Sequence, residues 1–104
     1  MNTAVIENEL PYVQGVRVTL DTLAIELSDG LTISVPLGWF PRLEHGRPDE
    51  RSNWRLIGKG HGIYWPDLDE DISFDGLLAG KPSGESQASF KKWLQKRTSR
   101  TANP

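Results

Sequence analysis

The chain has 104 residues, which is enough for one domain with a single modest core. It contains no cysteine, which excludes a disulfide framework, a thiolate metal site and a cysteine nucleophile. No apolar run approaches the roughly 18 residues that are needed to cross a bilayer, and the N-terminus lacks the pattern of a signal peptide. We therefore expect a cytoplasmic protein that does not contact a membrane.

The net charge is only −2, but the charges are distributed unevenly. Residues 1–80 hold six Lys and Arg against thirteen Asp and Glu, a net charge of −7, whereas residues 81–104 hold six against one, a net charge of +5. An acidic body with a basic tail can bind partners of either sign. Charged tails are also common as solvated surface, and we prefer that interpretation for the charge pattern alone.

Residues 15–36 alternate between apolar and polar side chains with the period of two that is typical of half-buried β-strands. The apolar positions fall into three runs, and Asp29-Gly30 separates the second from the third. This dipeptide indicates a two-residue hairpin turn of type I′, because that turn needs a positive φ at both central positions. The pattern predicts a three-stranded antiparallel meander and, with the helices described next, an α+β fold.

Beyond the meander, Leu37, Phe40 and Leu43 recur at helical spacing and predict a short helix. Pro48 is followed by two acidic residues and predicts the start of a second short helix. Apolar residues then alternate around a group of glycines and predict a second hairpin over 54–65.

The predicted core takes apolar side chains from the meander, the first helix, the second hairpin and the extended piece that follows it. These are Val18 with its neighbours Val16 and Leu20, Ile25, Ile33, Phe40, Leu43, Trp54, Leu56 and Ile72.

Residues 81–97 are predicted to form a linker and a basic amphipathic helix with Ser86 as its N-cap. The apolar stripe of this helix comprises only Phe90, Trp93 and Leu94. A helix of about twelve residues is marginal alone in water, so this stripe needs a surface to pack on. We expect the helix to serve association with a partner rather than the core of the domain.

The predicted organisation therefore has four parts, two of them without a fixed structure. They are a flexible N-terminal segment (1–13), an α+β domain (14–80), the linker with the basic helix (81–97) and a disordered tail (98–104).

Three acidic side chains, Asp67, Asp69 and Asp71, have the spacing of the first ligands of a calcium-binding loop. Such a loop also needs glycine at its sixth position and glutamate at its twelfth, where this chain has Ile72 and Leu78. We expect a solvated acidic turn with no metal ion, and the sequence predicts no cofactor.

The segment Gly58-Lys-Gly-His-Gly62 places His61 among glycines and close to Tyr64. A histidine in such an exposed turn could act as a general base or a metal ligand. The chain has only one other histidine, His45, and the glycines do not match the spacing of a phosphate-binding loop. A tight hairpin turn with a hydrogen-bonded histidine is the interpretation that we prefer.

Five blocks that follow one another in order resemble the bacterial domain-of-unknown-function 2442 family over about residues 14–80. They are LSDGLTISVP (27–36), WFPRL (39–43), ERSNWRLIG (50–58), GIYWPDLDEDI (62–72) and GLLAG (76–80). The resemblance implies a small α+β domain with no established catalytic residues. Some relatives look like partners that are encoded beside small toxin-like proteins, and at least one carries an appended helix-turn-helix. Here the segment after Gly80 is too short for such a domain, so we do not expect sequence-specific DNA binding from this chain alone.

Two hypotheses of function follow, and the lack of a complete catalytic constellation favours the first. In the first, the chain is a non-enzymatic interaction module, an antitoxin-like or regulatory partner that binds another protein or itself. Its candidate residues carry charge or lie on the final helix: Lys91, Lys92, Trp93, Lys96, Arg97, Asp67, Asp69 and Asp71. In the alternative, the chain is a small metal- or histidine-dependent enzyme centred on His61, Tyr64 and the acidic turn Asp67–Asp71.

Overall fold

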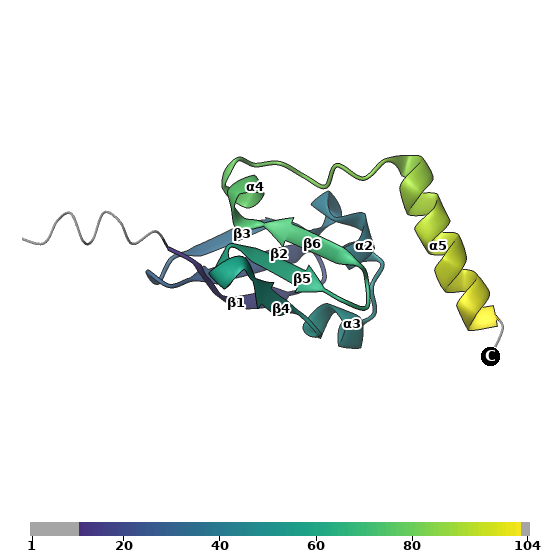
Figure 1. Cartoon of the computed structure of the whole chain (residues 1–104), viewed down its shortest axis with the longest axis horizontal. Coiled ribbons are helices and arrows are strands. Elements are labelled where there is room, and N and C mark those ends of the chain that lie inside the picture. The colour runs from purple at the N-terminus through teal and green to yellow at the C-terminus, as the bar shows by residue number, and fades with distance from the viewer. Residues whose placement is uncertain (1–10, 103–104) are drawn as a thin grey trace, which may run out of the picture.

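The computed structural model of the chain describes residues 11–102, and side chains over residues 11–97. It contains two three-stranded antiparallel sheets, several short helices and a longer C-terminal helix (Figure 1). The predicted α+β class is therefore confirmed. The ends of the two segments predicted to be flexible or disordered, residues 1–10 and 103–104, lie outside the described residues.

The first sheet is the meander that the sequence predicts. Strands β1 (Val13–Val18), β2 (Thr22–Leu27) and β3 (Thr32–Pro36) pair in that order. Ile25 of the central strand faces Val16 on one side and Ile33 on the other. The apolar positions therefore share one face of the sheet, as the alternation requires.

The turn between β2 and β3 differs from the predicted type I′ turn. The backbone N–H of Leu27 donates to the carbonyl of Leu31 at 2.9 Å, and that of Gly30 donates to the carbonyl of Leu27 at 3.0 Å. The loop thus has three residues, and within it only Gly30 has a positive φ, of 93°. In this geometry a single left-handed residue closes the hairpin, so Asp29 needs no positive φ.

The second sheet consists of β4 (Arg55–Ile57), β5 (Gly62–Trp65) and β6 (Glu70–Ser73). The order is β4-β5-β6 with both pairs antiparallel. The hairpin predicted over 54–65 is present, although β4 begins one residue after Trp54. Strand β6 was visible in the sequence only as a short extended piece, because only Ile72 and Phe74 alternate there.

Short helices connect the strands. They are η1 (Leu37–Trp39), α2 (Pro41–Glu44), α3 (Pro48–Ser52), η2 (Gly58–Gly60) and α4 (Phe74–Leu78), and α5 (Gln87–Ala102) follows after a linker. The single helix predicted from Leu37 to Leu43 is divided, because Phe40 has an extended φ of −129° and Pro41 begins a new helix. Helix α5 continues beyond Arg97, its predicted end.

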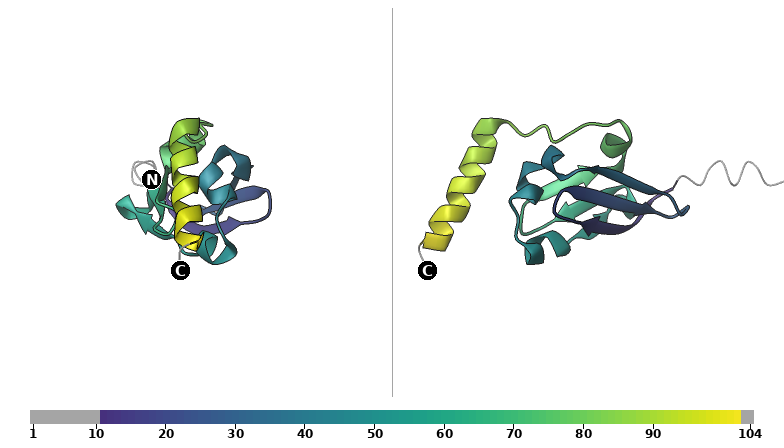
Figure 2. Two further views of the ribbon diagram at one scale, coloured as in Figure 1. Left: turned by 90° about the vertical axis from the view of Figure 1, so that its right-hand side faces the viewer. Right: turned by 180° about the vertical axis from the view of Figure 1, so that it is seen from behind.

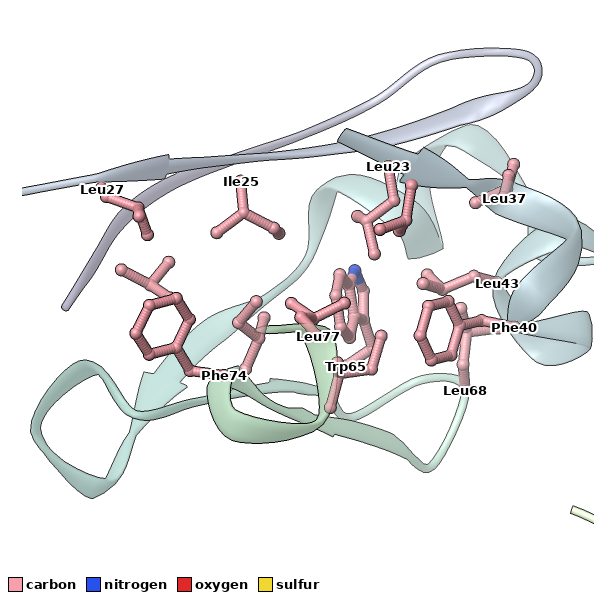
Figure 3. Close-up of a cluster of buried hydrophobic side chains, with 14 residues drawn as sticks. Leu23, Ile25, Leu27, Leu37, Phe40, Leu43, Trp65, Leu68, Phe74 and Leu77 are labelled. Atoms are coloured by element: carbon pink, nitrogen blue, oxygen red, sulfur yellow. The ribbon is translucent and has the colours of Figure 1, made fainter. Parts of the chain in front are cut away.

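The core lies between the two sheets, with side chains from the short helices closing its ends (Figure 3). The predicted core residues Ile25, Phe40, Leu43 and Ile72 are buried. Four others are partly buried and pack against this core: Val16, Val18, Ile33 and Trp54.

Two of the predicted core residues are exposed. Leu20 is 92% exposed, because β1 ends at Val18 and Leu20 falls in the turn that follows. Leu56 is 37% exposed although it lies opposite the fully buried Ile63. It belongs to an edge strand of three residues, so the neighbouring sheet covers it only in part.

Helix α5 lies across the end of the body that carries α2 and α3, where the body denotes residues 11–80 (Figure 2). A segment without helix or strand, residues 81–86, connects it to the body. Within the described residues, no helix is long and apolar enough to span a membrane.

Candidate functional site: the cleft between α5 and the body

A cleft of about 1050 Å³ lies between α5 and the body, and we call it the helix cleft. One wall belongs to the body and is formed by Arg42, Arg47, Glu50, Pro66, Asp67 and Asp69. The other belongs to the beginning and the inner side of the helix and is formed by Ser86, Ala88, Ser89, Lys92, Trp93, Lys96 and Arg97.

Arg42 of α2 fixes the start of the helix wall by binding Glu85. Its Nε lies 2.9 Å from Oε2 of Glu85, and its Nη2 lies 2.5 Å from the same oxygen. The guanidinium also donates to the carbonyl of Asp69 at 3.1 Å. Both charged side chains are largely buried, at 15% and 10% exposure. The hydrogen bonds from Arg42 lower the pKa of Glu85, so this pair is ionised at neutral pH.

Arg97 fixes the far end of the helix wall by binding Glu50 of α3. Its two terminal nitrogens donate to the two carboxylate oxygens at 3.0 and 2.9 Å, the bidentate geometry that suits arginine and a carboxylate. The hydrogen bonds from Arg97 lower the pKa of Glu50 and raise that of Arg97. Charged pairs therefore hold the chain at Glu85, just before α5, and at Arg97, in the second half of the helix.

Trp93 lies between these two anchors. The guanidinium carbons of Arg42 and Arg97 lie 5.3 and 4.7 Å from the centre of its ring, within the range of cation–π contacts. Phe90 stacks on Trp93 with the ring centres 5.7 Å apart, and His45 meets Phe90 edge-on at 5.0 Å. Trp93 also packs against the hydrophobic core of the body, so the apolar stripe of the predicted amphipathic helix contacts both that core and the side chains of Arg42 and His45.

The net charges of the two walls of the helix cleft differ in sign, because the body wall has three acidic residues against two arginines and the helix wall has only basic ones. Lys92 and Lys96 are exposed on the helix wall, and Asp67 and Asp69 are exposed on the body wall. Lys91, also predicted as an interaction residue, is exposed on α5 but does not line the cleft.

The acidic turn is a four-residue loop, 66–69, between β5 and β6. Asp69 adopts a positive φ of 49°, and Asp67 accepts a hydrogen bond from the side-chain amide of Asn53 at 2.9 Å. Asp71 lies beyond the turn, in β6, and lines a smaller pocket of about 240 Å³ beside Arg42. Among the described residues no group of three or more His, Cys, Asp or Glu could hold a metal ion.

Glu70 also lines the smaller pocket, and it was not singled out from the sequence. Burial raises its pKa to about 7, and the negative charge of Glu85 adds to the rise while Arg42 opposes it. This carboxyl therefore changes charge near neutral pH beside the Arg42–Glu85 pair.

His61 and Tyr64 do not line the helix cleft. His61 is exposed and precedes β5, whereas the acidic turn follows the other end of that strand. Tyr64 instead packs against Arg55, whose guanidinium carbon lies 5.5 Å from the centre of the ring. His61 is thus separated from the acidic turn by the length of β5, whereas Tyr64 lies opposite Asp71 of β6.

The anchoring residues Arg42, Glu50 and Glu85 were missed by reasoning from the sequence. Arg42 and Glu85 are 43 positions apart, and no local pattern indicates that they pair. The one relevant signal in the sequence was the distribution of net charge, since a basic tail that follows an acidic body favours contact between the two.

The comparisons with known proteins agree with this architecture. The family model "Protein of unknown function (DUF2442)" matches residues 13–83. A crystal structure of a protein of unknown function from Rhodospirillum rubrum is 27% identical and has a TM-score of 0.63. Its match covers 77% of this chain and 96% of that one.

A solution structure of an uncharacterized protein from Chromobacterium violaceum is 19% identical, also with a TM-score of 0.63. Its match covers 90% of this chain and 83% of that one, and at this identity it shows the fold alone. No curated protein matches the chain. The family match spans both sheets and ends before α5. The chain belongs to the DUF2442 family, whose function is not known.

Proposed function

We propose that this protein is a non-enzymatic interaction module, an antitoxin-like or regulatory partner that binds another protein in the helix cleft. The observation that carries the proposal is the cleft itself, in which Trp93 is flanked by two arginines and by walls of opposite charge. Tryptophan and arginine are the residue types most enriched where protein interfaces gain their binding energy.

The dimensions and the lining of the helix cleft favour a segment of polypeptide over a small molecule. Small-molecule sites are mostly apolar and commonly range from about 300 to 1,000 Å³. This cleft, of about 1050 Å³, is lined among the described residues by ten charged side chains or serines and by three apolar residues, of which Trp93 alone is aromatic. An extended segment that carries both signs of charge could pair with Lys92 and Lys96 on one wall and with Asp67 on the other.

Capture from the host tests this proposal. We expect the tagged protein to retain a host protein that the variant Lys92→Glu/Lys96→Glu loses, because the variant reverses the charge of the helix wall. The variant Lys59→Glu is the control, since Lys59 is also an exposed lysine but lies in η2, away from the cleft. Captured proteins are identified by mass spectrometry, and circular dichroism checks that each variant is folded.

Equal capture by the wild type and the cleft variant would contradict the proposal. Loss of capture by both variants would also contradict it, because the interaction would then depend on net charge rather than on the cleft.

A further inference from the structure

Most of the charged side chains that line the helix cleft are already paired within the chain. The three arginines among them bind carboxylates of the body or of the linker: Arg42 with Glu85, Arg47 with Asp49 and Arg97 with Glu50. Lys92 and Lys96 differ, because neither forms an ion pair or a hydrogen bond with any side chain that the structure describes. These two lysines are therefore the cationic groups of the helix cleft that a ligand can bind.

The two lysines lie on adjacent turns of α5, and both are exposed. Side chains four positions apart on a helix have their Cβ atoms about 5–6 Å from each other, so Lys92 and Lys96 form a short basic row on the helix wall. Across the cleft, Asp67 and Asp69 are exposed on the body wall. The side chain of Asp69 remains 82% exposed although it lies 3.7 Å from Arg42. A ligand in the helix cleft thus meets positive charge on one side and negative charge on the other.

We propose that the helix cleft binds an extended polypeptide segment with acidic residues at positions i and i+2 and a basic residue between them. This segment is the part of the partner protein that enters the cleft, so its assignment rests on the proposed function. The two carboxylates of the segment bind Lys92 and Lys96, and its basic side chain points towards Asp67 and Asp69.

The geometry of an extended chain matches these two walls. Successive side chains of a strand point to opposite sides, and positions two apart are separated by about 6–7 Å, close to the spacing of side chains on adjacent helical turns. A single-stranded nucleic acid, by contrast, has a negative charge on every nucleotide. Its phosphates would also approach Asp67 and Asp69, and such contacts between like charges cost binding energy. The acidic side chains of the body wall therefore favour a polypeptide.

Two labelled peptides of identical composition test this order of charges. Both have blocked ends and a core between flanking glycines and serines, and the core is Glu-Lys-Glu in one peptide and Glu-Glu-Lys in the other. We expect the wild-type protein to bind the Glu-Lys-Glu peptide with a Kd at least about fivefold lower, because the reordered peptide cannot pair with both walls. Fluorescence anisotropy measures both affinities.

Adjacent lysines of α5 provide a matched pair of variants. Lys92→Glu should weaken binding of the Glu-Lys-Glu peptide at least about fivefold, because it places a carboxylate on the helix wall. Lys91→Glu makes the same change in net charge at an exposed position that does not line the cleft, and it should leave the affinity unchanged. Asp67→Asn/Asp69→Asn should reduce the preference for Glu-Lys-Glu over Glu-Glu-Lys, since it removes the exposed acids of the body wall. Circular dichroism checks that each variant is folded.

Equal affinities of the wild type for the two peptides, or no binding of either, would overturn this specificity. Equal losses from Lys91→Glu and Lys92→Glu would also overturn it, as would a single-stranded DNA oligonucleotide of equal length that binds more tightly than the Glu-Lys-Glu peptide. The proposed function is tested separately by capture from the host. Capture that is lost in Lys92→Glu/Lys96→Glu, together with equal binding of the two peptides, would support the helix cleft as an interface and contradict the alternating segment.

Discussion

Glu50 holds Arg97, 47 positions further along the chain, and caps the start of α3 with the same carboxylate. The oxygens of Glu50 accept hydrogen bonds from the guanidinium at 2.9 and 3.0 Å, and one of them also accepts from the backbone N–H of Arg47 at 2.8 Å. One side chain thus joins a short helix of the body to the C-terminal helix. Because Glu50 binds Arg97, substitution of Arg97 tests how α5 is held.

Replacing Arg97 with Gln should release α5 without unfolding the body. We expect faster amide exchange in α5 and a change in the free energy of unfolding of about 1 kcal/mol or less, because the pair is partly exposed to solvent. Hydrogen exchange measured by mass spectrometry checks this. Arg47→Gln is the control, since it removes an exposed arginine that immediately precedes α3 and pairs with Asp49, and it should leave exchange in α5 unchanged. Unchanged exchange in α5 of the Arg97 variant would show that the pair with Glu50 does not hold the helix.

Leu56 of β4 and Ile63 of β5 lie opposite each other, but replacing each with alanine should cost different amounts of stability. Ile63 is fully buried, so Ile63→Ala should cost about 2–5 kcal/mol of unfolding free energy. Leu56 is 37% exposed, so Leu56→Ala should cost about 1 kcal/mol or less. Urea denaturation of the two variants measures the difference, and equal costs would contradict the assignment of β4 as an incompletely covered edge.

Gly30 closes the β2–β3 hairpin with a φ of 93°, and a Cβ there would meet no neighbour within 4 Å. Gly30→Ala should therefore destabilise the protein by about 1–2 kcal/mol through backbone strain alone. Gly38→Ala is the matched control, because a Cβ at Gly38 has room and φ there is not positive. Thermal denaturation compares the two, and a neutral Gly30→Ala would contradict the three-residue loop.

Glu70 should make stability depend on pH near neutrality. Its folded-state pKa of about 7 lies above its ordinary value of 4.5, so the folded protein holds a proton between these values that the unfolded chain has lost. The contribution of this group to stability therefore falls as pH rises from about 4.5 to 7 and remains unfavourable above 7. Glu70→Gln should stabilise the protein at pH 8 by about 1–2 kcal/mol, since part of the carboxyl remains in contact with water, and should have little effect at pH 5. An equal effect of Glu70→Gln at the two pH values would show that the carboxyl titrates normally.

The first sheet was predictable because its signals are local. Alternation along three consecutive strands places Ile25 between Val16 and Ile33, and the same pattern predicts which face is buried. The errors arise where a strand ends or lies at an edge. Leu20 continues the alternation but lies past the end of β1. Leu56 lies on the predicted face, but on an edge strand that the neighbouring sheet covers only in part.

The helix cleft was only partly predictable. The sequence indicated Trp93, the lysines of α5 and the aspartates of the acidic turn, because charge and helical spacing can be seen in short windows. It gave no sign that Arg42 binds Glu85 or that Glu50 binds Arg97, since these pairs depend on how the body is folded. Side chains that converge from distant positions become visible only in three dimensions.

The central claim is that α5 serves association and lies outside the core, and truncation after Gly80 tests it most directly. Every fully buried residue of the described core lies between Val13 and Leu77, so the truncated chain should keep its fold. We expect its melting temperature to fall by about 8 °C or less, as a loss of about 1 kcal/mol implies for a domain of this size. Sedimentation should at the same time show that the complex with the captured partner is lost. A truncated protein that unfolds at a much lower temperature, from a wild type that is monomeric throughout, would show that α5 belongs to the core.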